Sequence, residues 1–139
     1  MSILDSSFSS SKKRILFFVN VDWFFLSHRL PIALEALENG YEVHVATTIT
    51  DSANILKFKD IKVHPITIQR SGANIYNLLV NLVKIFLIIR RVKPDILHAI
   101  TIKPILLSGL VRIFYKRLPF ISSISGLGIT FNSPGFFSR

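Results

Sequence analysis

Short apolar runs alternate with longer amphipathic stretches along most of this sequence. The first run, Arg14 to Val21 (RILFFVNV), is continuous and rich in β-forming residues. Such a run is typical of a strand buried on both faces. Four further runs predict strands at Glu42 to Thr47, Ile61 to Ile68, Asp95 to Ile100 and Phe120 to Ile124.

Helical periodicity fills the segments between these strands. Apolar residues at i, i+3, i+4 and i+7 predict a helix from Ser27 to Asn39, with Ser27 as its N-cap and Pro31 in its first turn. Gly40 suits the left-handed residue that ends such a helix. Further helices are predicted over Ser52 to Lys59, Asn74 to Arg91 and Pro104 to Tyr115.

Strands that alternate with helices through short connections predict right-handed βαβ units. We therefore expect an α/β fold, a Rossmann-like open parallel sheet with helices on both faces. Residues 1–11 are serine-rich and read as a flexible leader, and residues 12–131 form the domain. Ser133 and Pro134 suit the start of another helix, so residues 132–139 are expected to begin a truncated one.

Composition narrows the possible functions. The 139 residues suit one domain, and the lack of cysteine excludes disulfides, thiolate metal sites and a cysteine nucleophile. Seventeen Lys and Arg against eight Asp and Glu give a net charge of +9, which favours an anionic partner. The charge does not cluster with aromatic residues in an RNA-binding pattern, so nucleic acid is disfavoured.

Two apolar stretches resemble a signal peptide and a membrane-spanning helix, but neither meets the criteria for one. Lys12 to Leu26 resembles a signal peptide, but Asn20 and Asp22 interrupt it and no cleavage site follows. Ile75 to Ile89 is shorter than the roughly 20 apolar residues that span a bilayer. We therefore expect a cytoplasmic protein. The apolar helices from Asn74 and from Pro104 end in the dibasic pairs Arg90-Arg91 and Lys116-Arg117, which suits contact with the inner face of the membrane, although both helices can also simply cover the sheet.

Ligands of open parallel sheets collect beyond the carboxyl ends of the strands. The loop from Asn20 to Arg29 lacks both G-x-G-x-x-G and the phosphate-cradling G-x-x-x-x-G-K-[ST]. Its aromatic residues have two alternative roles: they stack on a sugar ring or a lipid, or they fill the core. Its basic end, His28 and Arg29, suits an anion. The candidate binding residues here are Asp22, Trp23, Phe24, Ser27, His28 and Arg29.

Three later loops lie at the same edge. His98 near the end of the fourth strand is a catalytic candidate or a core histidine. Lys103 suits phosphate contact, and Thr101 and Arg70 belong to the same rim as candidate acceptor-binding residues. Backbone amides of Ser125, Gly126 and Gly128 can face a donor phosphate. His44 and His64 alternate within strands and are interpreted as structural, and no cluster predicts a metal.

Three segments resemble the N-terminal domain of family 4 glycosyltransferases of the GT-B fold. They are NVDWFFLSHRLPIA after the first strand, PDILHAITIKP around the fourth, and ISGLGITF after the fifth. The resemblance covers Lys13 to Phe131 and is strongest to bacterial enzymes that build capsule, O-antigen and other lipid-linked glycans. It departs from the family at Ile100 and Ser125, where many members carry histidines.

The resemblance implies a retaining transferase that needs no metal or cofactor and takes a nucleotide-sugar as substrate. The N-terminal domain would hold the acceptor, often a polyprenyl-diphosphate-linked glycan, and a C-terminal domain would hold the nucleotide. We therefore expect the acceptor-binding half of a glycosyltransferase, inactive without its C-terminal half. The alternatives are a subunit of a split two-chain enzyme and a non-catalytic basic module that binds a membrane.

Overall fold

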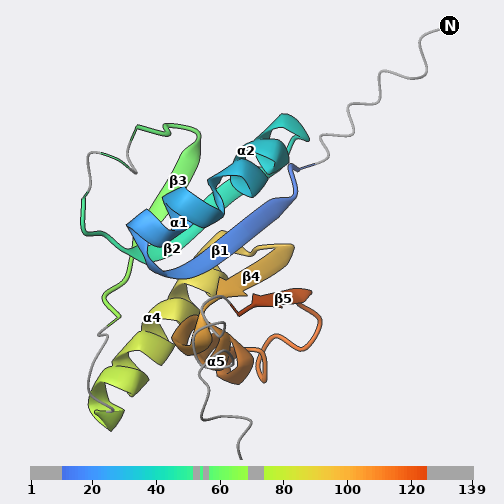
Figure 1. Ribbon diagram of the computed structural model, residues 1–139. Helices are drawn as coiled ribbons and strands as arrows, with labels where there is room; N and C mark the ends of the chain where they lie inside the picture. The colour runs from blue at the N-terminus through green and yellow to red at the C-terminus, as the bar shows by residue number, and fades with distance from the viewer. Residues whose placement is uncertain (1–10, 52–53, 55–56, 69–73, 125–139) are drawn as a thin grey trace, which may run out of the picture.

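The protein is an α/β domain with one parallel sheet, seen in a computed structural model that describes residues 11–51, 54, 57–68 and 74–124 (Figure 1). The five strands lie in the order β3-β2-β1-β4-β5, and every neighbouring pair is parallel. This topology confirms the predicted Rossmann-like fold. The strands are β1 (Arg14–Val21), β2 (Glu42–Thr48), β3 (Ile61–Pro65), β4 (Ile96–Ile100) and β5 (Phe120–Ser123).

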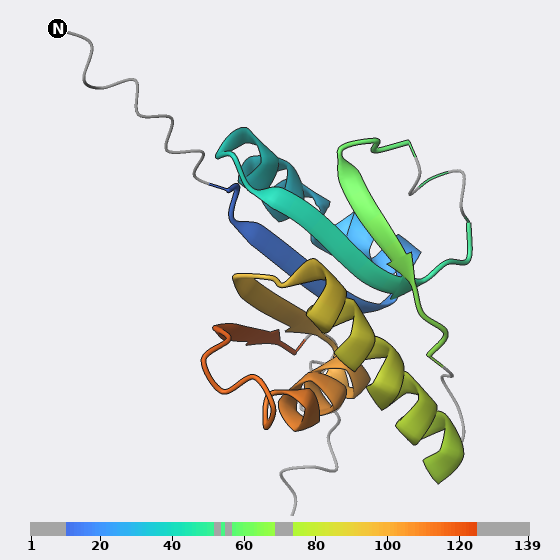
Figure 2. The same cartoon turned by 180° about the vertical axis from the view of Figure 1, so that it is seen from behind.

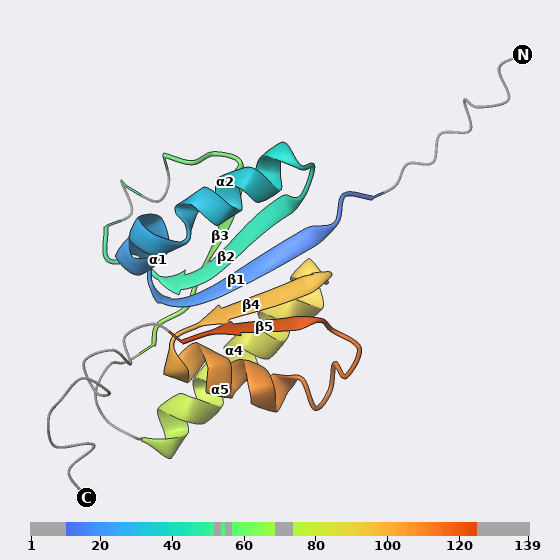
Figure 3. The same ribbon diagram turned by 45° about the vertical axis from the view of Figure 1, so that its right-hand side comes forward.

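Helices cover both faces of the sheet (Figures 2 and 3). On one face, α1 (Asp22–His28) and α2 (Leu30–Glu38) pack over β1 and β2. On the other face, α4 (Ile75–Val92) and α5 (Ile102–Val111) lie side by side. The central strand β1 contributes to two cores: Phe17 packs with Phe25 toward α1, and Phe18 packs with Ile85 toward α4.

The connection between β1 and β2 differs from the prediction. We predicted a loop followed by one helix, and the structure has two short helices. The chain becomes helical at Asp22 directly after β1, breaks at Arg29, and resumes as α2 with Pro31 in its first turn. Ser27 is therefore not an N-cap, because its hydroxyl donates to the Trp23 carbonyl 2.8 Å away within α1. The i, i+3 pattern located the second helix but carried no sign of the break at Arg29.

Other boundaries follow local chemistry. Gly40 has φ of +85° after α2, as predicted, and the Asn74 side chain accepts from the Tyr76 N–H at the start of α4. Two predicted elements have other bounds: the third strand stops at Pro65 instead of Ile68, and α5 runs from Ile102 to Val111 instead of from Pro104 to Tyr115. Residues 1–10 and 125–139, and much of the predicted helix from Ser52 to Lys59, lie outside the described residues.

Helix α4 places its polar and apolar residues in an unusual way. Asn81 is 8% exposed and lies on the inner face with Ile85, whereas a row of apolar side chains one turn apart faces outward. That row is Ile75, Leu79, Val83 and Leu87, each more than half exposed at 72, 53, 56 and 52%. In the described part of the chain, no helix is long and apolar enough to cross a membrane.

Candidate functional site at the carboxyl ends of the strands

Asp22 ties the end of β1 to the segment that follows β2. Its carboxylate is 1% exposed and accepts four hydrogen bonds, from the N–H groups of Trp23, Thr50 and Asp51 and from the Thr50 hydroxyl. Burial alone would raise the pKa of Asp22, but the Thr50 hydroxyl and the three backbone N–H groups together lower it. An ionised carboxylate therefore fixes the shape of this edge from within.

The aromatic residues of α1 divide between the core and the surface. Phe25 is fully buried and meets Phe17 edge to face, with ring centroids 5.5 Å apart. Trp23 is half exposed and meets Phe24 edge to face, and Phe24 stacks on His28 at 4.3 Å. Phe25 therefore fills the core, and the stacking of the exposed aromatic residues on a ligand stays a prediction. We call Trp23, Phe24 and His28 the α1 aromatic surface.

His98 lies on the α1–α2 side of the sheet, beside the break between these helices. Its Nε2 is 2.8 Å from the Ser123 hydroxyl of β5, and its ring lies 5.3 Å from that of Phe17. Burial lowers the pKa of His98, and the positive charge of Arg29 lowers it further. The imidazole is therefore neutral at neutral pH and within electrostatic reach of Arg29.

Thr101 connects β4 to α5 in a conformation that threonine rarely adopts. Its φ of 73° and ψ of 164° belong to a region that is almost restricted to glycine. Its N–H donates to the Ser123 carbonyl, and its buried hydroxyl finds no hydrogen-bond partner in the described residues. Local strain of this kind concentrates at functional sites.

Lys103 lies in the first turn of α5, two residues after Thr101.

The contacts of His98 and Thr101 bring four residues together at this edge of the sheet. They are Arg29, His98, Thr101 and Ser123, and we call them the carboxyl-end site. Ser123 was missed by sequence reasoning, because its role depends on the register of β5 against β4. The predicted site residues Arg70, Ser125, Gly126 and Gly128 lie outside the described residues.

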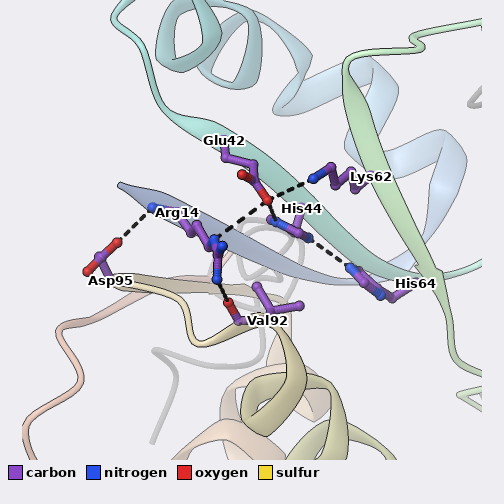
Figure 4. Close-up of polar contacts among 7 residues, drawn as sticks. All are labelled: Arg14, Glu42, His44, Lys62, His64, Val92 and Asp95. Atoms are coloured by element: carbon purple, nitrogen blue, oxygen red, sulfur yellow. Dashed lines mark hydrogen bonds and ion pairs between the residues drawn. The ribbon is translucent and has the colours of Figure 1, made fainter. Parts of the chain in front are cut away.

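A second polar cluster occupies the other face of the sheet (Figure 4). Glu42 Oε1 lies 2.7 Å from His44 Nε2 and 2.9 Å from Lys62 Nζ, and His44 Nδ1 lies 2.9 Å from His64 Nε2. We call these four residues the Glu42 cluster. A neutral His44 that donates to Glu42 must accept at Nδ1, so His64 donates there. The contacts agree with the structural role predicted for both histidines.

Neither cluster gathers a set of metal ligands. Within the described ranges, no group of three or more His, Cys, Asp or Glu residues is arranged to hold a metal ion. The candidate site therefore offers positive charge, a neutral imidazole, hydroxyl groups and an aromatic surface. Positive charge suits an anion, and exposed aromatic side chains suit the face of a ring.

The chain belongs to the glycosyl transferase 4-like family, whose sequence pattern matches residues 14–138. No curated protein gives a significant match. Among solved structures, MurG of Acinetobacter baumannii has a TM-score of 0.64 at 18% identity, over 81% of this chain and 34% of MurG. A glycosyltransferase of Rickettsia africae has a TM-score of 0.61 at 20% identity, over 89% of this chain and 34% of that protein.

The same fold occurs outside the transferases. UDP-GlcNAc 2-epimerase of Neisseria meningitidis, solved with UDP-GlcNAc bound, has a TM-score of 0.60 at 17% identity, over 82% of this chain and 32% of the epimerase. The chain spans about a third of the length of each of these proteins. At such identities the likeness establishes the GT-B type of fold, and the family match identifies the glycosyltransferase class.

Proposed function

We propose that this chain is the acceptor-binding domain of a glycosyltransferase that acts on a lipid-linked glycan in cell-surface polysaccharide synthesis. A nucleotide-sugar is the donor. An acceptor hydroxyl forms the new bond to the anomeric carbon, and the nucleoside diphosphate leaves. The family match supports the reaction class. The observation that carries the acceptor assignment is the apolar outer face of α4 and α5.

Each of these two neighbouring helices carries a row of exposed apolar side chains. The row on α4 runs from Ile75 to Leu87, and α5 adds Ile102, Leu106 and Leu110, which are 55, 61 and 44% exposed. Exposed apolar surfaces of this extent mark interaction sites. Because cations flank the rows, this surface suits the interface of an anionic membrane, where a lipid-linked acceptor resides.

The carboxyl-end site supplies the chemistry for such an acceptor. In our proposal, Arg29 and Lys103 attract its diphosphate, and the α1 aromatic surface packs on a sugar ring. His98 is the candidate for accepting the proton of the acceptor hydroxyl, since burial keeps its imidazole neutral. Arg70, Ser125, Gly126 and Gly128 remain proposed contacts for phosphate groups.

The proposal places the protein in the cytoplasm, against the inner face of the membrane. It also requires a nucleotide-binding half, supplied in the same polypeptide or by a partner subunit. The three solved relatives are each about three times as long as the matched domain, which supports this requirement. A non-catalytic membrane module is the competing function, and a transfer assay separates the two.

The assay joins this domain to the C-terminal half of a GT-B glycosyltransferase and supplies labelled UDP-sugars with bacterial membranes. We expect transfer of label to lipid-extractable glycan by the joined protein but not by the domain alone. Transfer by the domain alone would show that it is a whole enzyme. Inactivity of the joined protein with every donor would favour the non-catalytic module.

Lys103→Ala provides a residue-level test in the joined protein. Loss of its charge should lower kcat/KM for the lipid acceptor roughly tenfold, as expected for one charge-assisted phosphate contact. The matched control is Lys59→Ala, which removes an exposed lysine from the segment before β3. If Lys103→Ala instead lowers the melting temperature with unchanged activity, Lys103 is structural.

A further inference from the structure

A hollow lies at the opposite edge of the sheet, beside the amino ends of β4 and β5. Its walls are the last turn of α4, the link from α4 to β4, and the turn that leads into β5. It has a volume of about 510 Å³, within the range of small-ligand sites. The lining residues are Ile89, Arg90, Lys93, Pro94, Asp95, Tyr115, Arg117, Leu118 and Pro119.

Backbone contacts hold the walls of this hollow in place. Lys93 adopts a left-handed conformation with φ of 51°, and its N–H donates to the Ile89 carbonyl. The turn is closed by the Leu118 N–H, which donates to the Tyr115 carbonyl, and the ring of Tyr115 lies 5.6 Å from that of Phe86. The backbone that frames the hollow is therefore fixed by the fold.

Charge around the hollow is predominantly positive. Arg90, Lys93 and Arg117 stand against a single carboxylate, that of Asp95. One oxygen of Asp95 already accepts the Arg14 N–H at 2.8 Å (Figure 4), and none of the three cations forms an ion pair with a described residue. The three cations thus outnumber the one carboxylate at the hollow, which leaves a net positive charge there.

The floor of the hollow is apolar. Ile89 is 2% exposed, and Tyr115 and Leu118 pack against the core on the α4–α5 side. A purely ionic ligand gains nothing from such a floor, and a purely apolar ligand gains nothing from three cations. The combination fits a ligand that carries a phosphate group next to an aliphatic chain.

We propose that this basic hollow binds an amphiphilic phosphate, with the phosphate among Arg90, Lys93 and Arg117 and the aliphatic part on Tyr115 and Leu118. One residue of each dibasic pair, Arg90 of Arg90-Arg91 and Arg117 of Lys116-Arg117, lines the hollow. Such a ligand can be a phospholipid of the membrane or a soluble phosphate ester. Binding here requires no sugar transfer, so its test is independent of the proposed reaction.

The test uses the full chain and two soluble probes, dihexanoylphosphatidic acid below its micelle concentration and glycerol 3-phosphate. Isothermal titration should give a dissociation constant for the chain-bearing probe at least roughly tenfold lower than for glycerol 3-phosphate. The variant Arg90→Gln/Arg117→Gln should weaken the chain-bearing probe by roughly tenfold or more. Equal binding of both probes would contradict a role for the apolar floor.

The matched control is Lys57→Gln/Lys59→Gln, which removes the same charge from the segment before β3. Equal weakening by control and test variants would overturn the site, because the effect would then be net charge alone. Sedimentation with phosphatidylglycerol vesicles separates the two sources of ligand. Cosedimentation lost in the Arg90→Gln/Arg117→Gln variant assigns the site to membrane lipid, and titration without cosedimentation assigns it to a soluble ester.

Discussion

The two polar clusters of this sheet use carboxylates in different ways. Asp22, in the connection that leaves β1, accepts from three backbone N–H groups and one hydroxyl, all of them uncharged donors. Glu42 in β2 is instead surrounded by the basic side chains of Lys62, His44 and, at 3.6 Å, Arg14. The first arrangement fixes the backbone at the carboxyl ends of the strands, and the second contains two histidines whose protonation makes it respond to pH closer to neutrality.

The largest expected effect is at Asp22. Asp22→Ala leaves the backbone N–H groups of Trp23, Thr50 and Asp51 without this acceptor, so we expect a loss of about 3 kcal/mol in the free energy of unfolding. Urea denaturation measures this loss, with Asp60→Ala as the control because Asp60 is exposed. A loss below about 1 kcal/mol would show that water replaces the carboxylate and that Asp22 does not organise this edge.

A smaller effect is expected from acid at the Glu42 cluster. Burial is the main cause that lowers the pKa of both His44 and His64, so the folded state binds protons less readily than the unfolded state. Stability is therefore present above about pH 6.5 and is lost as the pH falls below that value. Hydrogen bonds from Lys62 and His44 lower the pKa of Glu42 from 4.5 to about 2, so further stability is lost between these values.

Replacing both histidines tests this difference between the clusters. His44→Gln/His64→Gln should flatten the dependence of unfolding free energy on pH between 7.5 and 5.5, while His98 retains its own contribution. His28→Gln is the control, since His28 lies exposed on α1. A slope unchanged by the double replacement would mean that the pH response comes from elsewhere in the chain.

The smallest expected effect concerns the strained link after β4. Thr101→Gly removes both the side chain that disfavours φ of 73° and a buried hydroxyl without a described partner, so we expect a gain of about 1 kcal/mol. Thr101→Ser keeps the strain and should leave the melting temperature nearly unchanged. Destabilisation by glycine would indicate that the threonine side chain makes a contact that stabilises the fold.

The sequence was most informative where the pattern reflects burial. The continuous apolar run of β1, the long helix of α4 and the left-handed Gly40 were all predicted correctly, because each depends on neighbouring residues. The pattern did not predict that Asn81 of α4 lies on its buried face. Which face of a helix is covered depends on what packs against it, and periodicity alone does not contain that information.

The candidate site was less accessible to prediction. His98 and Arg29 were identified by their place at the strand ends, and the structure brings them within electrostatic reach. Ser123 and Thr50 escaped notice because their partners, His98 and Asp22, lie 25 and 28 residues away along the chain. Such contacts are set by strand register and loop closure, which a single sequence does not specify.

The central claim is that the carboxyl ends of the strands bind a lipid-linked acceptor. Hydrogen–deuterium exchange of this chain with a short-chain prenyl-diphosphate-linked N-acetylglucosamine tests it most directly. We predict protection of residues 22–29 and 101–105 by this acceptor, unchanged exchange at Glu42 to His44, and no protection by UDP-N-acetylglucosamine. Protection of residues 22–29 and 101–105 by the nucleotide-sugar, with none from the acceptor, would contradict the account.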